Sequence, residues 1–455
     1  MPTTPPSTVD RTRLSRLMAE EADRFRAAHP RSLELFEQAK HSLLDGVPMN
    51  WMSEWASPFP LFVDKAAGAS FRCVDGHDYV DFCLGDTGAM AGHGAAPTIA
   101  AVERQMRRGI THMLPTEDAI AAGEELRRRF GLPLWQFTMT ATDANRFSIR
   151  LARHITGRSK ILVHEECYHG SVDETLAALD ADGNIIASDG NIGPPVDPAL
   201  TSRVVPFNDI EALERALADE QVAAVLVEPA LTNVGIVLPE PGYHDALREI
   251  TRRTGTVLII DETHTICAGP GGMTGRDGLE PDMLVIGKTI GGGIPVGTYG
   301  MTEAIADRVR ASMPGRADIG GIGGTLAGYA LSLAAVRATL TEVLNDDAFS
   351  RMIPLAERWE AGVNDVIHSR GVPWHVTRLG ARAEYHFMPT PPRDGAEQIA
   401  NVDPLLDKYL HLAVMNRGVL MTPFHNMALM SPATTAADVD RHTQVFGEVV
   451  DALVG

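Results

Sequence analysis

The length, composition and charge of this chain exclude several classes of protein. Its 455 residues are too many for one simple core, and hydrophobic residues at 44% leave ample material for a large buried sheet. Lysine and arginine total 40 against 59 aspartates and glutamates, which gives a formal net charge of −19. Such an acidic chain repels nucleic acids and anionic membranes, so we expect neither as a partner.

The cysteines and the N-terminal segment indicate the cellular compartment of the protein. The 4 cysteines show no CxxC pair, so the sequence predicts neither a disulfide framework nor a zinc site. The segment up to Pro30 is polar and rich in proline near its start, without the apolar core of a signal peptide, and no apolar stretch of about twenty residues follows. We therefore expect a soluble protein of the reducing cytoplasm.

Residues 1–94 are expected to form an N-terminal arm and part of a small domain. Apolar residues recur at helical spacing between Leu14 and Phe25, which predicts a helix of the kind that often packs on a partner subunit. From Leu61 to Phe82 the pattern changes to short alternating runs broken by glycine, which predicts strands and a hairpin at Asp75-Gly76.

A large domain is expected over residues 95–328, followed by a C-terminal small domain over residues 329–455. In the large domain, helical stretches alternate with near-continuous apolar runs, a pattern typical of a mostly parallel sheet covered on both faces. A helical stretch over 326–369, strands around 374–388 and a last helix at 437–454 predict a smaller α+β lobe. The apolar runs are LWQFTMT, KILVH, AAVLVEP, TVLIIDE and MLVIGK.

Polar residues follow these runs, and ligands of open α/β sheets bind beyond the carboxyl ends of the strands. Lys288 follows MLVIG at the mouth of a buried strand, where desolvation favours the neutral, nucleophilic amine. An imine with an aldehyde cofactor then becomes possible. A solvated loop lysine is the alternative interpretation.

Asp261 closes the apolar run TVLIID, and a carboxylate there needs a cationic or donor partner to offset its burial. A protonated pyridine nitrogen would be such a partner, and the pairing would keep the ring an electron sink. The alternative is an aspartate that caps a helix or a turn.

Residues 140–144 lie between a strand-like run and an amphipathic helix. The first-turn N–H groups of that helix can hold a phosphate dianion, and the hydroxyls of Thr140 and Thr142 can add to them. A simple helix N-cap would use the same residues. Tyr168 offers an aromatic face that could stack on a planar cofactor, and a tyrosine of the core or the surface is the other explanation.

Motifs for nucleotides fail on inspection. Residues 287–289 read Gly-Lys-Thr like the end of a P-loop, but the required first glycine is Asp282. The glycine-rich stretches 269–275 and 291–297 miss the GxGxxG spacing, which disfavours a dinucleotide site.

Metal-binding motifs are also incomplete. After His164, Tyr168 stands where HExxH requires its second histidine. A site drawn from Asp261, His264 and Cys267 stays open as an alternative, but we expect no metal.

Taken together, these residues resemble the class III aminotransferases of pyridoxal 5'-phosphate (PLP) fold type I. The branch indicated contains glutamate-1-semialdehyde aminomutase and β-amino-acid aminotransferases, and the resemblance extends from about Pro60 to the C-terminus. Residues 140–145 correspond to the family's S-G-T-E-A-N, and residues 167–170 correspond to its x-Y-H-G. The motifs that follow in the family's order are Glu228-Pro229, Asp261-Glu262 and Lys288 with its glycines.

The resemblance implies an α/β fold with a large domain, which holds a mostly parallel seven-stranded sheet, and a smaller α+β domain built from N- and C-terminal segments. It implies three catalytic residues: Lys288 as the Schiff-base lysine, Asp261 at the ring nitrogen and Tyr168 stacked on the ring. Thr325 matches a threonine that reaches the phosphate of the neighbouring subunit, so a homodimer with shared active sites is implied. The other implied cofactor-binding residues are Thr140, Ala141 and Thr142 near the phosphate, Glu228, Asn233 near the phenolic oxygen, and Thr263.

This chain departs from the aminomutase pattern at several positions. Residues 47–51 lack the arginine of the aminomutase's S-P-V-R segment, and residues 424–428 lack the glutamate of its F-E-A-G-F segment. Thr263 and His264 replace the usual valine and its neighbour, and Ala141 replaces a glycine. These departures argue against glutamate-1-semialdehyde as the substrate.

A substrate pocket with an aromatic and apolar lining is expected, which suits a bulky or arylalkyl amine or a β-amino acid. For its two tryptophans, an anchoring role in the core or the dimer interface is the alternative. Arg382 and Arg378 are candidate partners of a substrate carboxylate. The expected lining residues are Trp51, Trp55, Asp86 and Met90.

We expect a PLP-dependent aminotransferase that moves an amino group between an amine or (β-)amino acid and a keto acid or other carbonyl acceptor by ping-pong chemistry. Lys288 would act as the general acid and base at the substrate Cα. The alternative is an intramolecular aminomutase or an amino-acid racemase or epimerase on the same scaffold. An inactive PLP-binding regulator is disfavoured, because no basic DNA-binding module accompanies the domain.

Overall fold

The computed structural model of the chain describes residues 9–193, 196–313 and 320–455, which divide into two compact units. The large unit comprises residues 96–347 and 392–398. Of the described residues, the small unit comprises 9–95, 348–391 and 399–455.

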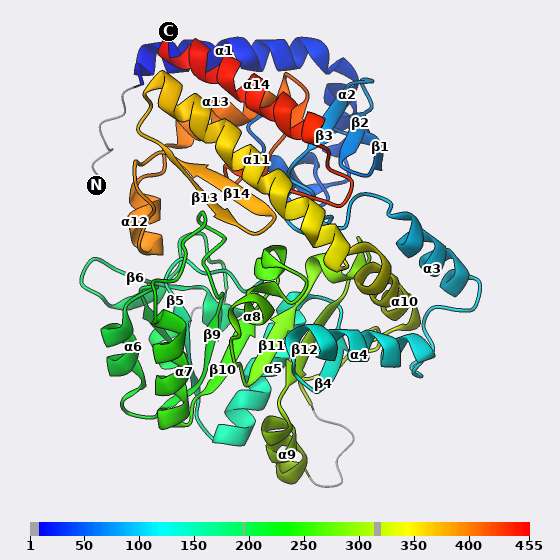
Figure 1. The fold of residues 1–455 in the computed structure, drawn as a ribbon, viewed down its shortest axis with the longest axis vertical. Helices are drawn as coiled ribbons and strands as arrows, with labels where there is room; N and C mark the ends of the chain where they lie inside the picture. The colour runs from blue at the N-terminus through cyan, green and yellow to red at the C-terminus, as the bar shows by residue number, and fades with distance from the viewer. Residues whose placement is uncertain (1–8, 194–195, 314–319) are drawn as a thin grey trace. The chain divides into compact units, whose positions relative to one another are not determined.

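A seven-stranded sheet forms the centre of the large unit (Figure 1). Its order is β4-β12-β11-β10-β9-β5-β8, and the five strands from β11 to β8 are parallel, whereas β12 is antiparallel to both of its neighbours. This sheet confirms the expected fold class. The strands are β4 (Leu134–Thr138), β5 (Lys160–His164), β8 (Ser202–Val205), β9 (Val222–Val227), β10 (Val257–Asp261), β11 (Met283–Ile286) and β12 (Gly297–Met301).

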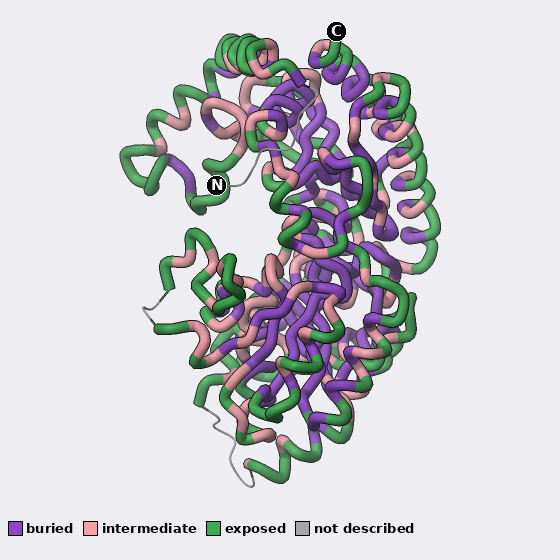
Figure 2. Tube along the Cα trace, turned by 90° about the vertical axis from the view of Figure 1, so that its left-hand side faces the viewer, coloured by how far each residue is buried: buried purple, intermediate pink, exposed green. Residues whose placement is uncertain are grey.

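Helices cover both faces of this sheet, which explains its continuous apolar runs. Every residue of β9, β10 and β11 is buried (Figure 2). Alternate strand residues pack with α5 (Ala141–Thr156) on one face and with α6 (Ile210–Leu217) and α7 (Tyr243–Thr254) on the other. The remaining elements of this unit are α3 (Ala96–Met106), α4 (Glu117–Phe130), β6 (Ala177–Leu179), β7 (Ile185–Ala187), α8 (Gly272–Asp277), α9 (Glu303–Ser312) and α10 (Ala330–Ala338).

The second boundary between the units differs from the predicted one. The helical pattern over 326–369 was expected to belong wholly to the small domain, but α10 packs against α3 and α4 of the large unit. A π-helical segment (Thr339–Val343) follows α10, and the next helix, α11 (Asp346–Arg370), starts after a break. The boundary therefore lies after Asp347 rather than after residue 328.

Two sheets and several helices make up the small unit. A four-stranded sheet has the order β1-β2-β3-β15, with β2 and β3 joined by the hairpin around Asp75-Gly76, and a three-stranded sheet has the order β13-β14-β16. The elements are α1 (Arg11–Ala28), α2 (Pro30–Ala39), β1 (Val63–Ala67), β2 (Ser70–Cys73), β3 (Asp78–Asp81), β13 (His375–Leu379), β14 (Arg382–His386), α12 (Gly395–Ala400, which begins in the large unit), α13 (Pro404–Met415), β15 (Val419–Leu420), β16 (Met427–Leu429) and α14 (Ala436–Val454).

The N-terminal helix packs on its own chain. α1 lies against α13, and its residues Leu14 and Phe25 are fully buried. Phe25 joins a core that includes Leu412 and Met415 of α13. The apolar stripe that suggested an arm for a partner subunit is thus used inside the small unit. Among the described helices, none combines the length and the apolar character needed to span a bilayer.

Candidate active site

Four neighbouring parallel strands bring polar residues to one edge of the central sheet. The carboxyl ends of β11, β10, β9 and β5 meet at this edge, where ligands of such sheets bind. Asp261 is the last residue of β10, Glu228 follows β9 directly, and Lys288 lies two residues after β11. Tyr168 lies in the loop after β5. Residues that are distant in the sequence therefore converge here.

Asp261 is a buried carboxylate with three hydrogen-bond donors. Its Oδ2 accepts from Asn145 Nδ2 at 2.8 Å and from His169 Nδ1 at 3.0 Å. Its Oδ1 accepts from the backbone N–H of Thr263 at 3.0 Å. Burial is the largest influence on the pKa of Asp261 and acts to raise it, but the donors together outweigh it and lower that pKa. Asp261 is therefore ionised in the protein interior.

His169 is the counter-ion of Asp261. Burial disfavours its charged ring, but the neighbouring Cys167 and Asp261 outweigh this effect and raise the pKa of His169 well above its ordinary value. Asn145 supports the pair, because its amide also donates to the backbone oxygen of His169 at 3.0 Å. Sequence reasoning gave no role to Asn145 or His169, although both lie inside the quoted motifs.

The N-terminus of α5 can hold an anion. Thr140 is the N-cap, and its Oγ1 accepts from the backbone N–H of Asp143 at 3.1 Å, as the helix-cap alternative required. The N–H groups of Ala141 and Thr142 belong to the first turn, where a helix offers no acceptor of its own. Together with the helix dipole, these two amides suit a phosphate group.

Two glycines let neighbouring loops approach this helix end closely. A Cβ atom at Gly287 would lie 2.9 Å from the Cβ of Ala141. A Cβ atom at Gly170, whose φ is +81°, would overlap the hydroxyl of Thr142. The loops after β5 and β11 are therefore both held against the N-terminus of α5.

Glu228 connects residues of two loops. Its Oε1 accepts from the backbone N–H of Tyr168 at 3.1 Å and from Asn233 Nδ2 at 2.9 Å. Its Oε2 accepts from both the backbone N–H and the hydroxyl of Thr232. Burial raises the pKa of Glu228. Three of the predicted cofactor residues, Tyr168, Glu228 and Asn233, thus form one hydrogen-bonded group.

Lys288 begins the 3-10 helix η6 (Lys288–Gly291) with a left-handed φ of 51°. Its Nζ contacts Nε2 of His264, which lies in the loop after β10. Sequence reasoning missed this contact, because it joins side chains of two separate loops. Thr263, in the same loop, is buried, and its side chain contributes to the lowered pKa of Asp261.

The expected substrate residues belong to the small unit. Trp51 is exposed, and its ring lies edge-on to Phe424, with 5.9 Å between the centroids. Trp55 packs against the apolar core, in line with the anchoring alternative. Met90 is fully buried, and Asp86 has a left-handed φ of 50°. A role of these residues in substrate binding stays a prediction.

The two candidate arginines already have carboxylate partners within the small unit. Arg382 is fully buried, and its Nη2 lies 3.6 Å from Glu384 Oε2. Arg378 Nε donates to Glu360 Oε2 at 2.7 Å. Arg382 is thus part of a buried ion pair on β14, and a role of either arginine in binding a substrate carboxylate stays a prediction.

Thr325 lies on the surface of the large unit, in a different place from Asp261 and its partners. It lines a cavity of about 470 Å³ together with Trp135 and Tyr329. Met113 and Leu114, at the rim of the same cavity, are 78% and 71% exposed. None of the residues that contact Asp261 lines this cavity.

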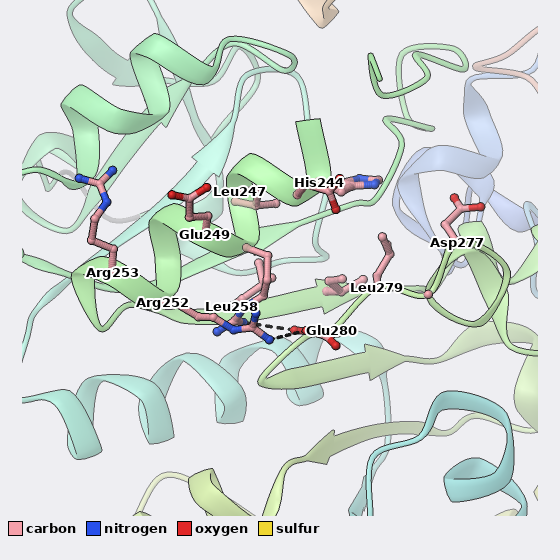
Figure 3. Close-up of a pocket in the computed structure, with 13 residues that line it drawn as sticks. His244, Leu247, Glu249, Arg252, Arg253, Leu258, Asp277, Leu279 and Glu280 are labelled. Atoms are coloured by element: carbon pink, nitrogen blue, oxygen red, sulfur yellow. Dashed lines mark hydrogen bonds and ion pairs between the residues drawn. The ribbon is translucent and has the colours of Figure 1, made fainter. Parts of the chain in front are cut away.

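A larger groove of about 700 Å³ lies beside α7 and residues 277–280 (Figure 3). Its arginines are paired with carboxylates: Arg252 with Glu280, as Figure 3 shows, and Arg248 with Asp282 at 3.0 Å. No predicted site residue lines the groove, so it is not the candidate site.

The alternative of a metal site has no support in the described part of the chain. Within it, no group of three or more histidine, cysteine, aspartate or glutamate side chains is arranged to hold a metal ion. Asp261 is engaged by His169, and His264 contacts Lys288.

The arrangement fits PLP in charge and in chemistry. A buried anion can hold the ring nitrogen in its protonated form, and first-turn amides can hold the phosphate. A lysine amine follows the adjacent strand, where it can form an imine with an aldehyde. Fold and site together define a PLP-dependent enzyme of fold type I.

Comparison with known proteins agrees with this class. The model of the class III aminotransferase family matches residues 51–452. Glutamate-1-semialdehyde 2,1-aminomutase of Methanopyrus kandleri is 31% identical over 94% of this chain and 98% of its own. The chain therefore belongs to the class III aminotransferase family.

Solved structures show the same likeness. A glutamate-1-semialdehyde aminomutase from Pseudomonas aeruginosa PAO1 is 49% identical with a TM-score of 0.96, over 98% of this chain and 99% of that one. A variant of the Pseudomonas protein, in which one lysine is replaced by alanine, has been solved in complex with PMP. An omega-transaminase from Sphaerobacter thermophilus is 30% identical with a TM-score of 0.87, over 95% of this chain and 99% of that one.

Proposed function

We propose that this protein is a PLP-dependent aminomutase, which exchanges an amino group and a carbonyl group between two carbons of one small molecule. Sequence reasoning placed transfer to a separate carbonyl acceptor first and intramolecular transfer second. The relatives named as aminomutases favour the second function. An aminomutase needs neither a keto-acid acceptor nor a separate amino donor.

The observation that carries the PLP chemistry of the proposal is the position of Asp261 at the end of β10, the strand next to the one that Lys288 follows, and the aminomutase relatives carry the choice between the two functions. The carboxylate is ionised, buried and held by three donors, so it can keep a pyridine nitrogen protonated. PLP, when bound, supplies an electron sink that stabilises negative charge on the carbon that bears the amino group.

The residues of this chain have separate tasks in the proposed reaction. The amides of Ala141 and Thr142 hold the phosphate, and Asp261 with His169 fixes the charge at the ring nitrogen. With PLP bound, Lys288 Nζ would act as general base at the substrate carbon that bears the amino group and as general acid at the cofactor carbon bound to the same nitrogen, so these are the two positions that it must reach. Because one amine would serve both positions, the reaction depends on where the fold holds that amine.

The substrate is proposed to carry neighbouring amino and carbonyl groups but to be recognised differently from glutamate-1-semialdehyde. Residues 47–51 contain no arginine, and residues 424–428 contain no glutamate. The two small-unit arginines that could bind a carboxylate are paired with Glu384 and Glu360. A substrate without a free terminal carboxylate fits these features best.

We also propose that two chains form a homodimer with shared active sites. The large unit exposes apolar side chains around Thr325, among them Met113 and Leu114. An apolar surface of this kind favours association. In such a dimer, Thr325 would serve the phosphate site of the partner subunit.

The decisive experiment supplies purified, PLP-loaded protein with amino-carbonyl compounds, with and without terminal carboxylates, and with no second substrate. NMR of the product mixture detects the positional isomer. The proposal predicts that the positional isomer forms without any added acceptor. The Lys288→Ala variant is the control and should form none. Turnover that requires an added carbonyl acceptor and releases a ketone would instead establish aminotransfer, the function suggested by the omega-transaminase relative.

A further inference from the structure

The contact between His264 and Lys288 has no part in the roles assigned above. His264 Nε2 lies within hydrogen-bond reach of Lys288 Nζ, and the imidazole is buried. The ammonium form of lysine has only donors, so the ring nitrogen that faces it in this form is the acceptor. The proton of the neutral ring is then on Nδ1.

The loop that carries His264 is rigidly held. The backbone N–H of Glu262 donates to Val285 O of β11 at 2.8 Å. The buried carboxylate of Glu262 accepts from the hydroxyl of Thr265 and from the backbone N–H groups of Met273 and Thr274. His264 therefore projects from a loop that is fixed on both sides.

The backbone of Lys288 is fixed as well, but its side chain is long. The left-handed φ of 51° is unfavourable for lysine, and the preceding Gly287 lies so close to Ala141 that an added Cβ would come within 2.9 Å of it. Four methylene groups separate this backbone from the amine, and they give the free side chain many rotamers. A fixed backbone alone does not decide where Nζ lies.

We propose that His264 is a positioning residue, which accepts a hydrogen bond from Lys288 and holds the amine at the sheet edge beside Asp261 whenever it is not linked to the cofactor. The inference rests on the proposed function of Lys288. The acceptor atom Nε2, rather than the bulk of the imidazole, is the feature of His264 that holds the Lys288 amine in place.

The test compares His264→Gln, which keeps an acceptor, with His264→Leu, which has similar bulk and no acceptor. Apo-protein is mixed with pyridoxal phosphate and reduced with borohydride at set times, and the phosphopyridoxyl peptide that contains Lys288 is quantified by mass spectrometry. No substrate is present, so the result does not depend on whether the enzyme is a mutase or a transferase.

We expect His264→Leu to slow capture at Lys288 by roughly tenfold, the effect of one lost hydrogen bond, and His264→Gln to stay within about threefold of the parent protein. Reductive methylation of Lys160, whose amine donates to Ala199 O at 2.8 Å, reports whether the large unit is intact and should be equal in all three proteins. The proposal would be overturned if His264→Leu captured pyridoxal phosphate at the same rate as the parent protein. It would also be overturned if both variants lost the same share of that rate while methylation of Lys160 stayed unchanged.

Discussion

The carboxylate of Asp261 and the imidazole of His169 form a buried ion pair, with 3.0 Å between Oδ2 and Nδ1. The pair joins the end of β10 to the loop after β5, and Asn145 of α5 donates to both partners. One oxygen of Asp261 is thereby committed to the protein. The other oxygen accepts the backbone N–H of Thr263 at 3.0 Å, and it is the oxygen that we propose as the partner of the ring nitrogen.

Replacement of Asp261 by asparagine keeps the shape of the side chain and removes its charge. A hydrogen bond to a charged group contributes about 1.5–3 kcal/mol, so turnover should fall by roughly 10-fold to 100-fold or more. Steady-state kinetics of the reconstituted variant measure the effect. Undiminished turnover with full cofactor content would show that Asp261 is not the ring partner.

The ion pair also predicts a dependence of stability on pH. Because the pKa of His169 is raised, its contribution is complete below the ordinary value of 6.5 and is lost as pH rises through the raised pKa. Because the pKa of Asp261 is lowered, its contribution is complete above the ordinary value of 3.8 and is lost as pH falls through the lowered pKa. Both contributions are complete between these two values.

His169→Gln tests this dependence. The difference in unfolding free energy between the parent protein and the variant should be constant from about pH 4 to 6.5 and should shrink at higher pH. Denaturant titrations of the apo-proteins at pH 5, 6 and 8 measure it. A difference that grows above pH 6.5 would contradict a charged His169.

Gly170→Ala should weaken the phosphate site. A methyl group there overlaps the hydroxyl of Thr142, whereas Gly183, with a nearly identical φ of +80° against +81°, has nothing within 4 Å of an added Cβ. Both alanine variants should lose about 1 kcal/mol of stability from the unfavourable φ. Only Gly170→Ala should also raise the dissociation constant for PLP, by roughly tenfold, as fluorescence titration can determine. Equal PLP affinities in the two variants would argue against a phosphate site at Thr142.

The proposed dimer surface can be tested with a charged substitution. Met113→Asp places a carboxylate in the exposed apolar area near Thr325 and should shift the protein towards monomers, as analytical ultracentrifugation can detect. Ile192→Asp is the control, because Ile192 is 99% exposed and does not line that cavity. A dimer that withstands Met113→Asp would place the interface elsewhere.

Local chemistry made much of the large unit predictable. Strands β9, β10 and β11 are buried on both faces, so their sequences are continuous apolar runs, and the polar residue after each run marks the site. β12 was not among the predicted runs, because its sequence, GTYGM, contains two glycines. At Gly300 the ring of Trp135 lies 2.8 Å from where a Cβ would be, so this strand needs a residue without a side chain.

Other features depend on tertiary contacts that a sequence pattern does not contain. The apolar stripe of α1 showed that the helix packs on something, but not that the partner is α13 of the same chain. The pairing of His264 with Lys288 and the burial of Arg382 beside Glu384 each require two segments to meet. In each case the residue type indicated the kind of interaction that the residue makes. Only the fold identified the residue or helix that it contacts.

Borohydride reduction of the PLP-loaded protein, followed by peptide mapping, tests the central claim most directly. The account predicts one phosphopyridoxyl group per chain, carried by Lys288, and none in Lys288→Ala. A protein that carries the group on another lysine, or that takes up no PLP at all, would contradict it.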